Sequence, residues 1–292
     1  MEIEKVGVLG CGLMGHGIAQ ICAQAGWTVV VREVDQGKLD AGLAKIEKQL
    51  AKAVDKGKVS AEDADAVRGR LEGTLDYSDL ADCDLVIEAI TEDLDAKLAM
   101  WRELDSIVKP EATFATNTSS LSVAEQAAAT SRPERFLGLH FFNPAQVMPL
   151  LEVVRAEGST DDAVQLGFDL GETLSKTTVA AGDNRGFIVN RLLVPYMLDA
   201  MRAYEDGVGS VADIDTAMMA GASHPMGPLT LADFVGLDTL ASIAAVMHAA
   251  YGEERFAAPA TLTKLVEAGD YGRKSGRGFS DYSGEKPEPT DP

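Results

Sequence analysis

The sequence predicts an α/β fold in which a mainly parallel sheet, covered by helices, is followed by a second domain made of helices. Short β-branched runs alternate with longer helical segments over the first two-thirds of the chain, a pattern typical of such a sheet. From Phe187 onward, helical periodicity continues without a convincing strand until a possible fragment near Phe279. The length of 292 residues also favours two domains over one.

Apolar runs define the expected strands of the first domain. They lie at Val6–Gly10, Thr28–Glu33, Leu85–Ala89, Thr113–Thr116, Phe136–Phe141 and Leu150–Val154. The expected helices run from Gly12 to about Gly26, over roughly Gln36–Lys56, and over Val123–Ala129.

The polar stretch Ala181–Gly186 is expected to separate the domains, which places them at residues 1–184 and 185–292. Pro195 falls inside the first helix of the second domain and is expected to kink it. The tail Gly284–Pro292 is rich in proline and acidic residues and is expected to fray.

Composition excludes several classes of function. With Lys+Arg 26 against Asp+Glu 46, the formal charge is -20, which disfavours binding to nucleic acid or anionic membranes. The three cysteines show neither paired nor metal-type spacing, so we expect a reducing compartment and no metal site. We expect no signal peptide, because the N-terminus moves from charged residues straight into a strand pattern, and the sequence shows no run of about 18 apolar residues. A cytoplasmic enzyme or binding protein is expected.

A glycine-rich turn, Gly10-Cys-Gly12-Leu13-Met14-Gly15, follows the first strand and opens a helix. The first glycine permits the tight turn, the second lets the backbone approach a pyrophosphate, and the third allows close packing of helix on strand. Glu33 ends the second strand, where its carboxylate would bind ribose hydroxyls and favour NAD over NADP. Arg32 beside it could tolerate NADPH, and Asp35 is the second candidate for the ribose.

Among the four histidines, His140 lies where it could do chemistry, since structural roles are simpler for His16, His224 and His248. His140 closes an apolar strand, and the next strand carries Glu152 in an otherwise apolar run. If the two strands pair antiparallel, these residues lie directly opposite, with Cβ atoms about 5 Å apart. The carboxylate would fix the tautomer and raise the basicity of the imidazole, so that the ring could accept a proton from a substrate hydroxyl. A purely structural buried pair is the alternative.

The small polar run Asn117-Thr-Ser119-Ser120 follows another strand, at the sheet edge where open α/β sheets bind ligands. One of these residues is expected to cap the next helix, and the others to contact a ligand.

Six motifs occur in a fixed order along the chain. They are Gly10-x-Gly-x-Met-Gly15, Asn117-Thr-Ser-Ser120, His140-Phe-Phe-Asn-Pro144, Gly186-Phe-Ile-Val-Asn-Arg191, His224-Pro-Met-Gly-Pro228 and Lys274-Ser-Gly-Arg-Gly-Phe279. Together they resemble the 3-hydroxyacyl-CoA dehydrogenases, in particular the short 3-hydroxybutyryl-CoA dehydrogenases, over Lys5 to Tyr282.

The resemblance implies a Rossmann-type NAD-binding domain, a helical domain that mediates homodimerisation, an acyl-CoA substrate and a place in fatty acid β-oxidation. The family's catalytic pair falls on His140 and Glu152, and its substrate contacts on Ser119 and Asn190. Its cofactor contacts fall on the glycine loop and on Glu33, Glu92, Lys97, Asn117, Ser119, Asn143 and Lys274. The chain departs from the family at Arg185, where a proline is usual, which predicts a looser hinge and an added charge near the cleft.

Because CoA is anionic, a local cationic dock is needed. Four lysines at helical spacing form a stripe on the helix after the second strand: Lys45, Lys48, Lys52 and Lys56. Lys56 and then Lys52 are the preferred phosphate contacts, and a merely solvated face is the alternative. Leu43, Ile46, Leu50 and Val54 form the apolar stripe of the same helix.

Two other functions stay open at this point. One is a dehydrogenase of the same superfamily that acts on a free hydroxy acid or sugar acid, which would need no dock so far from the cleft. The other is a nucleotide-binding protein without catalysis, against which the joint presence of Ser119, His140, Glu152 and Asn190 argues.

Overall fold

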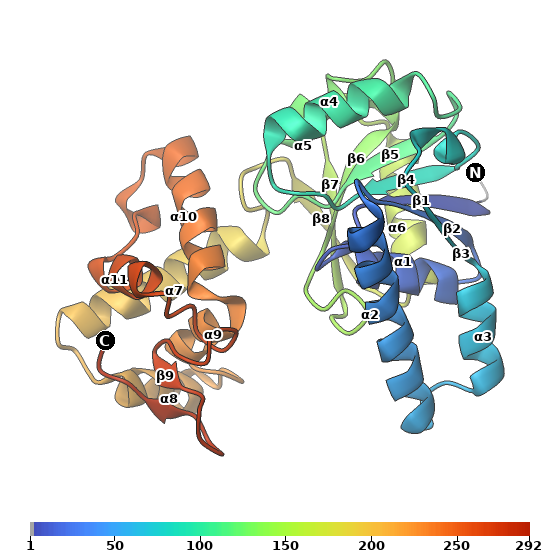
Figure 1. Cartoon of the computed structure of the whole chain (residues 1–292). Coiled ribbons are helices and arrows are strands. Elements are labelled where there is room, and N and C mark those ends of the chain that lie inside the picture. The colour runs from blue at the N-terminus through green and yellow to red at the C-terminus, as the bar shows by residue number, and fades with distance from the viewer. Residues whose placement is uncertain (1–2) are drawn as a thin grey trace. The chain divides into compact units, whose positions relative to one another are not determined.

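The computed structural model describes residues 3–292, and the chain divides between Asn184 and Arg185 into two compact units. The first unit contains a large sheet with helices, and the second is mainly helical (Figure 1). Each unit has a cluster of buried apolar side chains of its own.

The first unit is built on an eight-stranded sheet. Its strands are β1 (Lys5–Leu9), β2 (Thr28–Arg32), β3 (Leu71–Thr74), β4 (Leu85–Glu88), β5 (Thr113–Thr116), β6 (Phe136–Phe141), β7 (Leu150–Arg155) and β8 (Thr177–Gly182). They lie in the order β3-β2-β1-β4-β5-β6-β7-β8, and all neighbours are parallel except β6 and β7. The order of the strands reverses between β1 and β4, which is the point where sheets of this Rossmann type bind dinucleotides.

Helices cover both faces of this sheet. They are α1 (Gly15–Gln24), α2 (Gln36–Asp55), α3 (Ala61–Gly69), α4 (Leu94–Asp105), α5 (Val123–Ala127) and α6 (Asp161–Thr173), with 3-10 turns η1 (Tyr77–Leu80) and η2 (Pro133–Arg135). Figure 1 shows α4 and α5 over one face and α1 and α6 over the other. The start of α2 is set by Asp35, whose carboxylate accepts a hydrogen bond from the Lys38 amide and so satisfies one of the unpaired N–H groups of the first turn.

Strand β6 shows how the sheet positions chemistry. Leu139 and Phe141 belong to the core that includes residues of α1 and α6. A strand alternates its side chains between faces, so His140 points to the opposite face, together with Gly138. A Cβ atom on Gly138 would lie only 3.0 Å from Val123 of α5, which marks this as the face that α5 covers.

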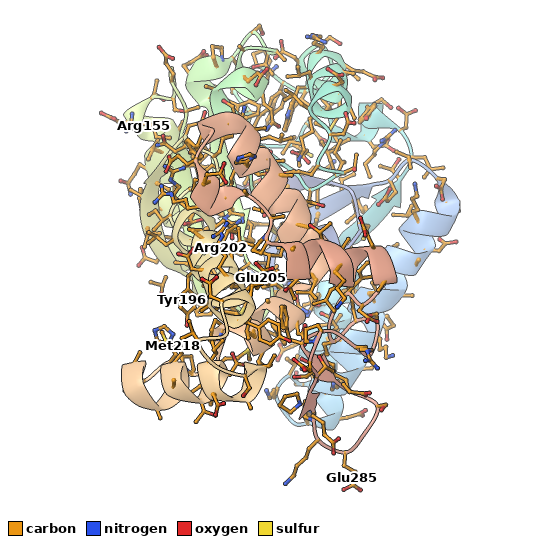
Figure 2. All side chains as sticks on the ribbon, turned by 90° about the vertical axis from the view of Figure 1, so that its left-hand side faces the viewer. Arg155, Tyr196, Arg202, Glu205, Met218 and Glu285 are labelled. Atoms are coloured by element: carbon orange, nitrogen blue, oxygen red, sulfur yellow. The ribbon has the colours of Figure 1, made fainter. Side chains whose placement is uncertain are left out.

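The second unit consists of five helices around an apolar core. They are α7 (Val189–Glu205), α8 (Val211–Ala222), α9 (Pro228–Val235), α10 (Leu237–Tyr251) and α11 (Ala260–Ala268), with the 3-10 turn η3 (Glu254–Phe256) and the short strands β9 (Ser280–Asp281) and β10 (Glu288–Pro289). Figure 2 labels Arg202 and Glu205 near the end of α7. Arg202 donates to the carbonyls of Glu254 and Ala257, and Glu205 accepts from the Thr261 amide, so these two side chains join α7 to η3 and α11.

Among the described residues, no single helix is long and apolar enough to cross a membrane, while the bent pair α9 and α10 meets that test by length and composition alone.

Most expected elements of the first unit are present with small shifts at their ends. The helix predicted from Gly12 begins at Gly15, because the glycine turn occupies the residues before it. Strands β3 and β8 were missed: β3 (Leu71–Thr74) is partly exposed along its whole length, and β8 (Thr177–Gly182) is half-buried and made of small residues. Neither carries the continuous apolar run that identified the buried strands.

The prediction of a frayed tail is wrong. Glu288–Pro289 pairs with Ser280–Asp281, and the Thr290 amide donates to the Phe279 carbonyl. The Thr290 hydroxyl also donates to the Gly278 carbonyl at 2.8 Å. Backbone pairing at the end of the chain therefore overrides the proline-rich composition. Pro195 does lie inside α7, where it is buried.

Candidate active site

The carboxyl ends of the neighbouring strands β2, β1, β4, β5 and β6 bring most of the predicted site residues to one edge of the sheet. The glycine turn follows β1, Glu33 follows β2, and Asn117 follows β5. His140 lies near the end of β6. These residues are far apart in sequence and become neighbours because parallel strands end on the same side.

His140 and Glu152 form the pair that strand register predicts. They are direct partners in the antiparallel pairing of β6 with β7, and Phe141 faces Leu151. His140 Nδ1 lies 2.6 Å from Glu152 Oε2. Both side chains are buried, and the Phe142 ring lies 4.5 Å from the imidazole. Because a carboxylate only accepts hydrogen bonds, Nδ1 carries the proton, and in the neutral ring Nε2 carries the lone pair.

Glu92 organises the polar run after β5. Its Oε1 accepts from the Ser119 amide at 2.9 Å, from the Ser120 amide at 3.1 Å and from the Thr118 hydroxyl. Burial opposes ionisation of this carboxyl, but the Lys97 ammonium and these hydrogen bonds outweigh it and hold the pKa of Glu92 below its usual value. The backbone at Ser119 is therefore positioned by the Glu92 carboxylate, which lies in the loop between β4 and α4.

Beneath Glu92 lies a buried ionic cluster with Lys97 and Glu88, which the sequence analysis did not predict. Lys97 Nζ is 2.7 Å from Glu88 Oε1 and 3.0 Å from Glu92 Oε2, and the Thr116 hydroxyl donates to Glu88 Oε2 at 2.6 Å. Glu88 is the last residue of an otherwise apolar strand, which is the same signal that identified Glu152. Because Lys97 is only 1% exposed, it supports Glu92 from inside the protein.

Asn117 ties two of these strand ends together, since its Oδ1 accepts from the Phe141 amide at 2.9 Å. Ser122, not a residue of the run itself, caps α5 through the Glu125 amide. The prediction that one residue of the run 117–120 caps this helix is thus wrong. Asn143 follows β6 in an exposed position, and its bond to Pro144 is cis.

The glycine turn has the geometry that a dinucleotide requires. Gly10 has φ +85, and a Cβ atom on Gly15 would lie 1.8 Å from the Gly10 carbonyl oxygen, so both positions require glycine. Nothing lies within 4 Å of a Cβ atom built on Gly12, and the Leu13 side chain is 66% exposed. The outer side of the turn is therefore open for a phosphate group to approach the backbone, as NAD would require.

Glu33 lies against this turn. Its carboxylate accepts from the Cys11 amide at 2.7 Å and from the Val34 amide at 3.0 Å. Arg32 is directed elsewhere: its guanidinium lies 3.9 Å from the centre of the Tyr77 ring, and its Nε donates to the Leu75 carbonyl. Asp35, the second candidate for the ribose, serves as the N-cap of α2.

Cysteine reactivity does not threaten the turn. Cys11 is buried against Gly42 of α2, and burial raises the pKa of its thiol to about 12. Within residues 3–292, no group of three or more His, Cys, Asp or Glu residues is placed to hold a metal ion.

The lysine stripe lies on the exposed side of α2. Lys45, Lys48, Lys52 and Lys56 are all exposed, while Ile46 and Leu50 are buried in the core and Leu43 and Val54 pack against it. Lys56 is the C-cap residue of α2. None of the four lies within 4 Å of a carboxylate in the part of the chain that the structure describes.

Two predicted site residues belong to the second unit. Asn190 lies in the first turn of α7, and Lys274 forms an ion pair with Asp238 of α10. The segment before α7 is held to its own unit, because the Tyr251 hydroxyl donates to the Arg185 carbonyl at 3.0 Å and the Arg191 amide to the Gly186 carbonyl at 2.9 Å.

Comparison with known proteins gives the same family over both units. Residues 5–184 match the NAD binding domain of 3-hydroxyacyl-CoA dehydrogenase, and residues 186–282 match its C-terminal domain. A 3-hydroxybutyryl-CoA dehydrogenase of Bradyrhizobium diazoefficiens is 45% identical over 288 residues, which cover 99% of this chain and 98% of that protein. One of Mycobacterium tuberculosis is 47% identical over 282 residues, covering 96% of this chain and 99% of that protein.

Solved structures agree with these sequence relatives. The crystal structure of the FadB2 protein of M. tuberculosis superposes with a TM-score of 0.94 at 46% identity, covering 97% of this chain and 100% of that one. The (S)-3-hydroxybutyryl-CoA dehydrogenase PaaH1 of Ralstonia eutropha gives a TM-score of 0.92 at 37% identity, with the same coverage.

Proposed function

The chain belongs to the 3-hydroxyacyl-CoA dehydrogenase family, and we propose that it interconverts (3S)-3-hydroxybutyryl-CoA and the corresponding 3-oxoacyl-CoA with NAD as cofactor. It is an NAD-dependent oxidoreductase by family. The observation that carries the proposal is the buried His140–Glu152 pair at the sheet edge where the glycine turn also lies.

In the oxidising direction, His140 acts as the general base. Its Nε2 takes the proton of the 3-hydroxyl group while the C3 hydrogen leaves as hydride, so that the C–O bond becomes a carbonyl. Glu152 stabilises the imidazolium and keeps the ring in the required tautomer through the 2.6 Å contact at Nδ1. NAD, when bound, supplies the acceptor for the hydride. In the reducing direction His140 returns the proton as a general acid.

Ser119 and Asn190 hold the substrate oxygens in this proposal. The backbone of Ser119 is anchored by Glu92, which is itself paired with Lys97, so the serine is presented by a rigid support. Preorganised donors of this kind need no rearrangement when charge develops on the substrate oxygen.

Several residues are proposed to hold the dinucleotide. The backbone of Gly10, Gly12, Leu13, Met14 and Gly15 receives the pyrophosphate, and Glu33 the adenosine ribose. Glu92, Asn117, Ser119, Asn143 and Lys274 complete the contacts. For Lys97 the burial supports an indirect role, in which it orients Glu92 toward the cofactor.

The remaining assignments concern the surroundings of the enzyme. The exposed Lys52 and Lys56 are proposed to bind the CoA phosphates, and the second unit to form a homodimer. A cytoplasmic location is proposed, and the three buried free cysteines, Cys11, Cys22 and Cys83, are compatible with a reducing compartment. A role in fatty acid β-oxidation is proposed from the family alone.

The deciding experiment compares acetoacetyl-CoA with free acetoacetate, using NADH and NADPH in parallel. We expect turnover with acetoacetyl-CoA and NADH to exceed the other combinations by at least about a hundredfold, because CoA contacts contribute binding energy that the free acid cannot use. Equal rates with the free acid would favour the hydroxy-acid dehydrogenase alternative. NADH binding without turnover of any substrate would favour a non-catalytic nucleotide-binding protein.

A further inference from the structure

Three polar side chains form a hydrogen-bonded chain behind the glycine turn, and none of them has a role in the mechanism above. His16 lies at the start of α1, Gln49 on α2, and Gln146 in the loop after β6. His16 Nδ1 lies 2.6 Å from the Gly12 carbonyl oxygen, and His16 Nε2 lies 2.9 Å from Gln49 Nε2. Gln146 Nε2 then donates to Gln49 Oε1 at 2.6 Å.

The Gly12 carbonyl determines which group donates and which accepts in each of these hydrogen bonds. A carbonyl oxygen only accepts, so Nδ1 of His16 carries the hydrogen. In the neutral ring Nε2 is then an acceptor, and it receives the Gln49 amide. The Gln49 carbonyl in turn receives the Gln146 amide. All three hydrogen bonds are therefore matched with a neutral imidazole, which is only 7% exposed.

The contact with Gly12 determines which way the next peptide group points. A trans peptide is planar, and its C=O and N–H groups point in opposite directions. Because the Gly12 carbonyl is turned toward His16, the Leu13 N–H is turned away from it. The Leu13 side chain is 66% exposed and the space beside Gly12 is open, so this is the outer side of the turn.

Gln146, at the other end of this hydrogen-bonded series, packs tightly against α1. A Cβ atom on Gly17 would lie 2.5 Å from Gln146 Oε1 and 3.1 Å from the Ala145 side chain, so the loop after β6 rests on the helix at this glycine. Gln146 follows Asn143 by three residues, and Gln49 lies on the helix that carries Lys52. The three hydrogen-bonded side chains thus join the glycine turn to the loop that carries Asn143, a proposed cofactor contact, and to the helix that carries Lys52, a proposed CoA contact.

We propose that His16 is a positioning residue of the dinucleotide site: it fixes the Gly12–Leu13 peptide so that the Leu13 N–H is presented to the cofactor diphosphate, and Gln49 and Gln146 hold the ring in place. The proposal rests on the glycine turn being the diphosphate site. Failure of that premise would appear as absent NADH binding in the unmodified protein, whereas failure of the present proposal would appear only in the variants.

The test measures the Kd of NADH by fluorescence titration for His16→Ala and His16→Asn. We expect about fivefold weaker binding for His16→Ala, as for the loss of one hydrogen bond. His16→Asn should restore most of the affinity, because the asparagine amide nitrogen can occupy the place of Nδ1. kcat at saturating NADH should change less than about twofold, since a positioning residue for binding does not contact the reacting atoms. His248→Asn in the second unit is the matched control and should bind NADH normally.

Equal affinities in the unmodified protein and His16→Ala would overturn the proposal, and so would equal weakening by Ala and Asn. The support from Gln49 is tested by Gln49→Leu, alone and combined with His16→Ala. If Gln49 acts through the His16 ring, Gln49→Leu by itself weakens NADH binding, but it causes no further weakening when it is combined with His16→Ala. Effects that multiply would overturn that part. Gln49→Leu and His16→Asn also keep the test informative if His16→Ala fails to fold.

Discussion

At the scale of single residues, the proposed chemistry depends on the proton that His140 can accept. The imidazole is held by Glu152 at 2.6 Å within a buried pair of strands, so its tautomer does not depend on solvent. A glutamine at either position would keep the size of the side chain and remove one function: the base at position 140, or the negative charge at position 152.

We predict that His140→Gln lowers kcat by at least about a hundredfold and leaves the Kd of NADH within about twofold, because it removes a general base and no dinucleotide contact. Glu152→Gln should lower kcat by at least about tenfold by losing the stabilisation of the imidazolium. Steady-state kinetics with acetoacetyl-CoA and NADH checks both, with His224→Gln as control. Turnover like that of the unmodified protein in His140→Gln would refute the mechanism.

A second prediction at this scale concerns acid stability. The folded pKa of Glu92 lies below its ordinary value of 4.5. Its ionised form therefore stabilises the protein above that value, and the stabilisation is lost as pH falls through the lowered pKa. We expect Glu92→Gln to have a lower Tm than the unmodified protein at pH 6, and the gap to shrink below about pH 4.

Thermal unfolding of both proteins across this pH range measures the effect. Glu111→Gln, at an exposed acidic position just before β5, is the control for a general effect of losing one carboxylate. A Tm gap that stays constant between pH 6 and pH 3 would show that Glu92 acts through its shape rather than its charge.

At the scale of elements, α2 combines a buried side with a cationic one. Ile46 and Leu50 are buried in the core, and the lysines on the other side have no carboxylate within 4 Å among the described residues. Glu47, also exposed on α2, is already paired with Arg68 of α3 at 2.6 Å. The helix therefore presents four lysines without an ion-pair partner among the described residues, although the whole chain is at -20.

We predict that Lys52→Glu with Lys56→Glu raises KM for acetoacetyl-CoA by about tenfold at low ionic strength, and that the effect shrinks near 0.5 M salt, where exposed charges are screened. KM for NADH should be unchanged. The exposed Lys264 on α11 of the second unit provides the control Lys264→Glu. An equal rise in KM at both salt concentrations would argue against a phosphate dock on α2.

At the scale of the whole molecule, large apolar side chains remain exposed on the second unit. Leu192 of α7 is 68% exposed and Met219 of α8 is 46% exposed. An exposed apolar side chain gains free energy when a protein–protein contact removes it from water. We therefore take Leu192 as the position at which to test the proposed homodimer of this unit.

We therefore predict that Leu192→Glu converts a dimer into a monomer, as measured by size-exclusion chromatography with light scattering. A buried, unpaired carboxylate at an apolar interface opposes association strongly. Val147→Glu in the first unit starts from the same exposure of 68% and should stay dimeric. A Leu192→Glu protein that remains dimeric would place the interface elsewhere.

Local patterns determined those parts of the protein whose physical signal lies within a few residues. Continuous apolar runs identified the buried strands, the glycine spacing identified the dinucleotide turn, and a carboxylate in an apolar run identified Glu152. Glu88 carries the same signal at the end of β4 and was missed. The register of β6 on β7 followed from strand pairing alone, since a slip of one residue would set His140 opposite the apolar Leu151 or Val153 instead of Glu152.

Only the tertiary structure decided the features in which distant segments satisfy one another. The partly exposed strands β3 and β8 are held by neighbours in the sheet and not by their own hydrophobicity, and the tail is held by pairing with β9. The support of Ser119 by Glu92 and Lys97, and of the Gly12 carbonyl by His16, joins residues on different strands and helices. A buried polar group must find its partner wherever the fold places one, so such contacts leave no periodic trace in the sequence.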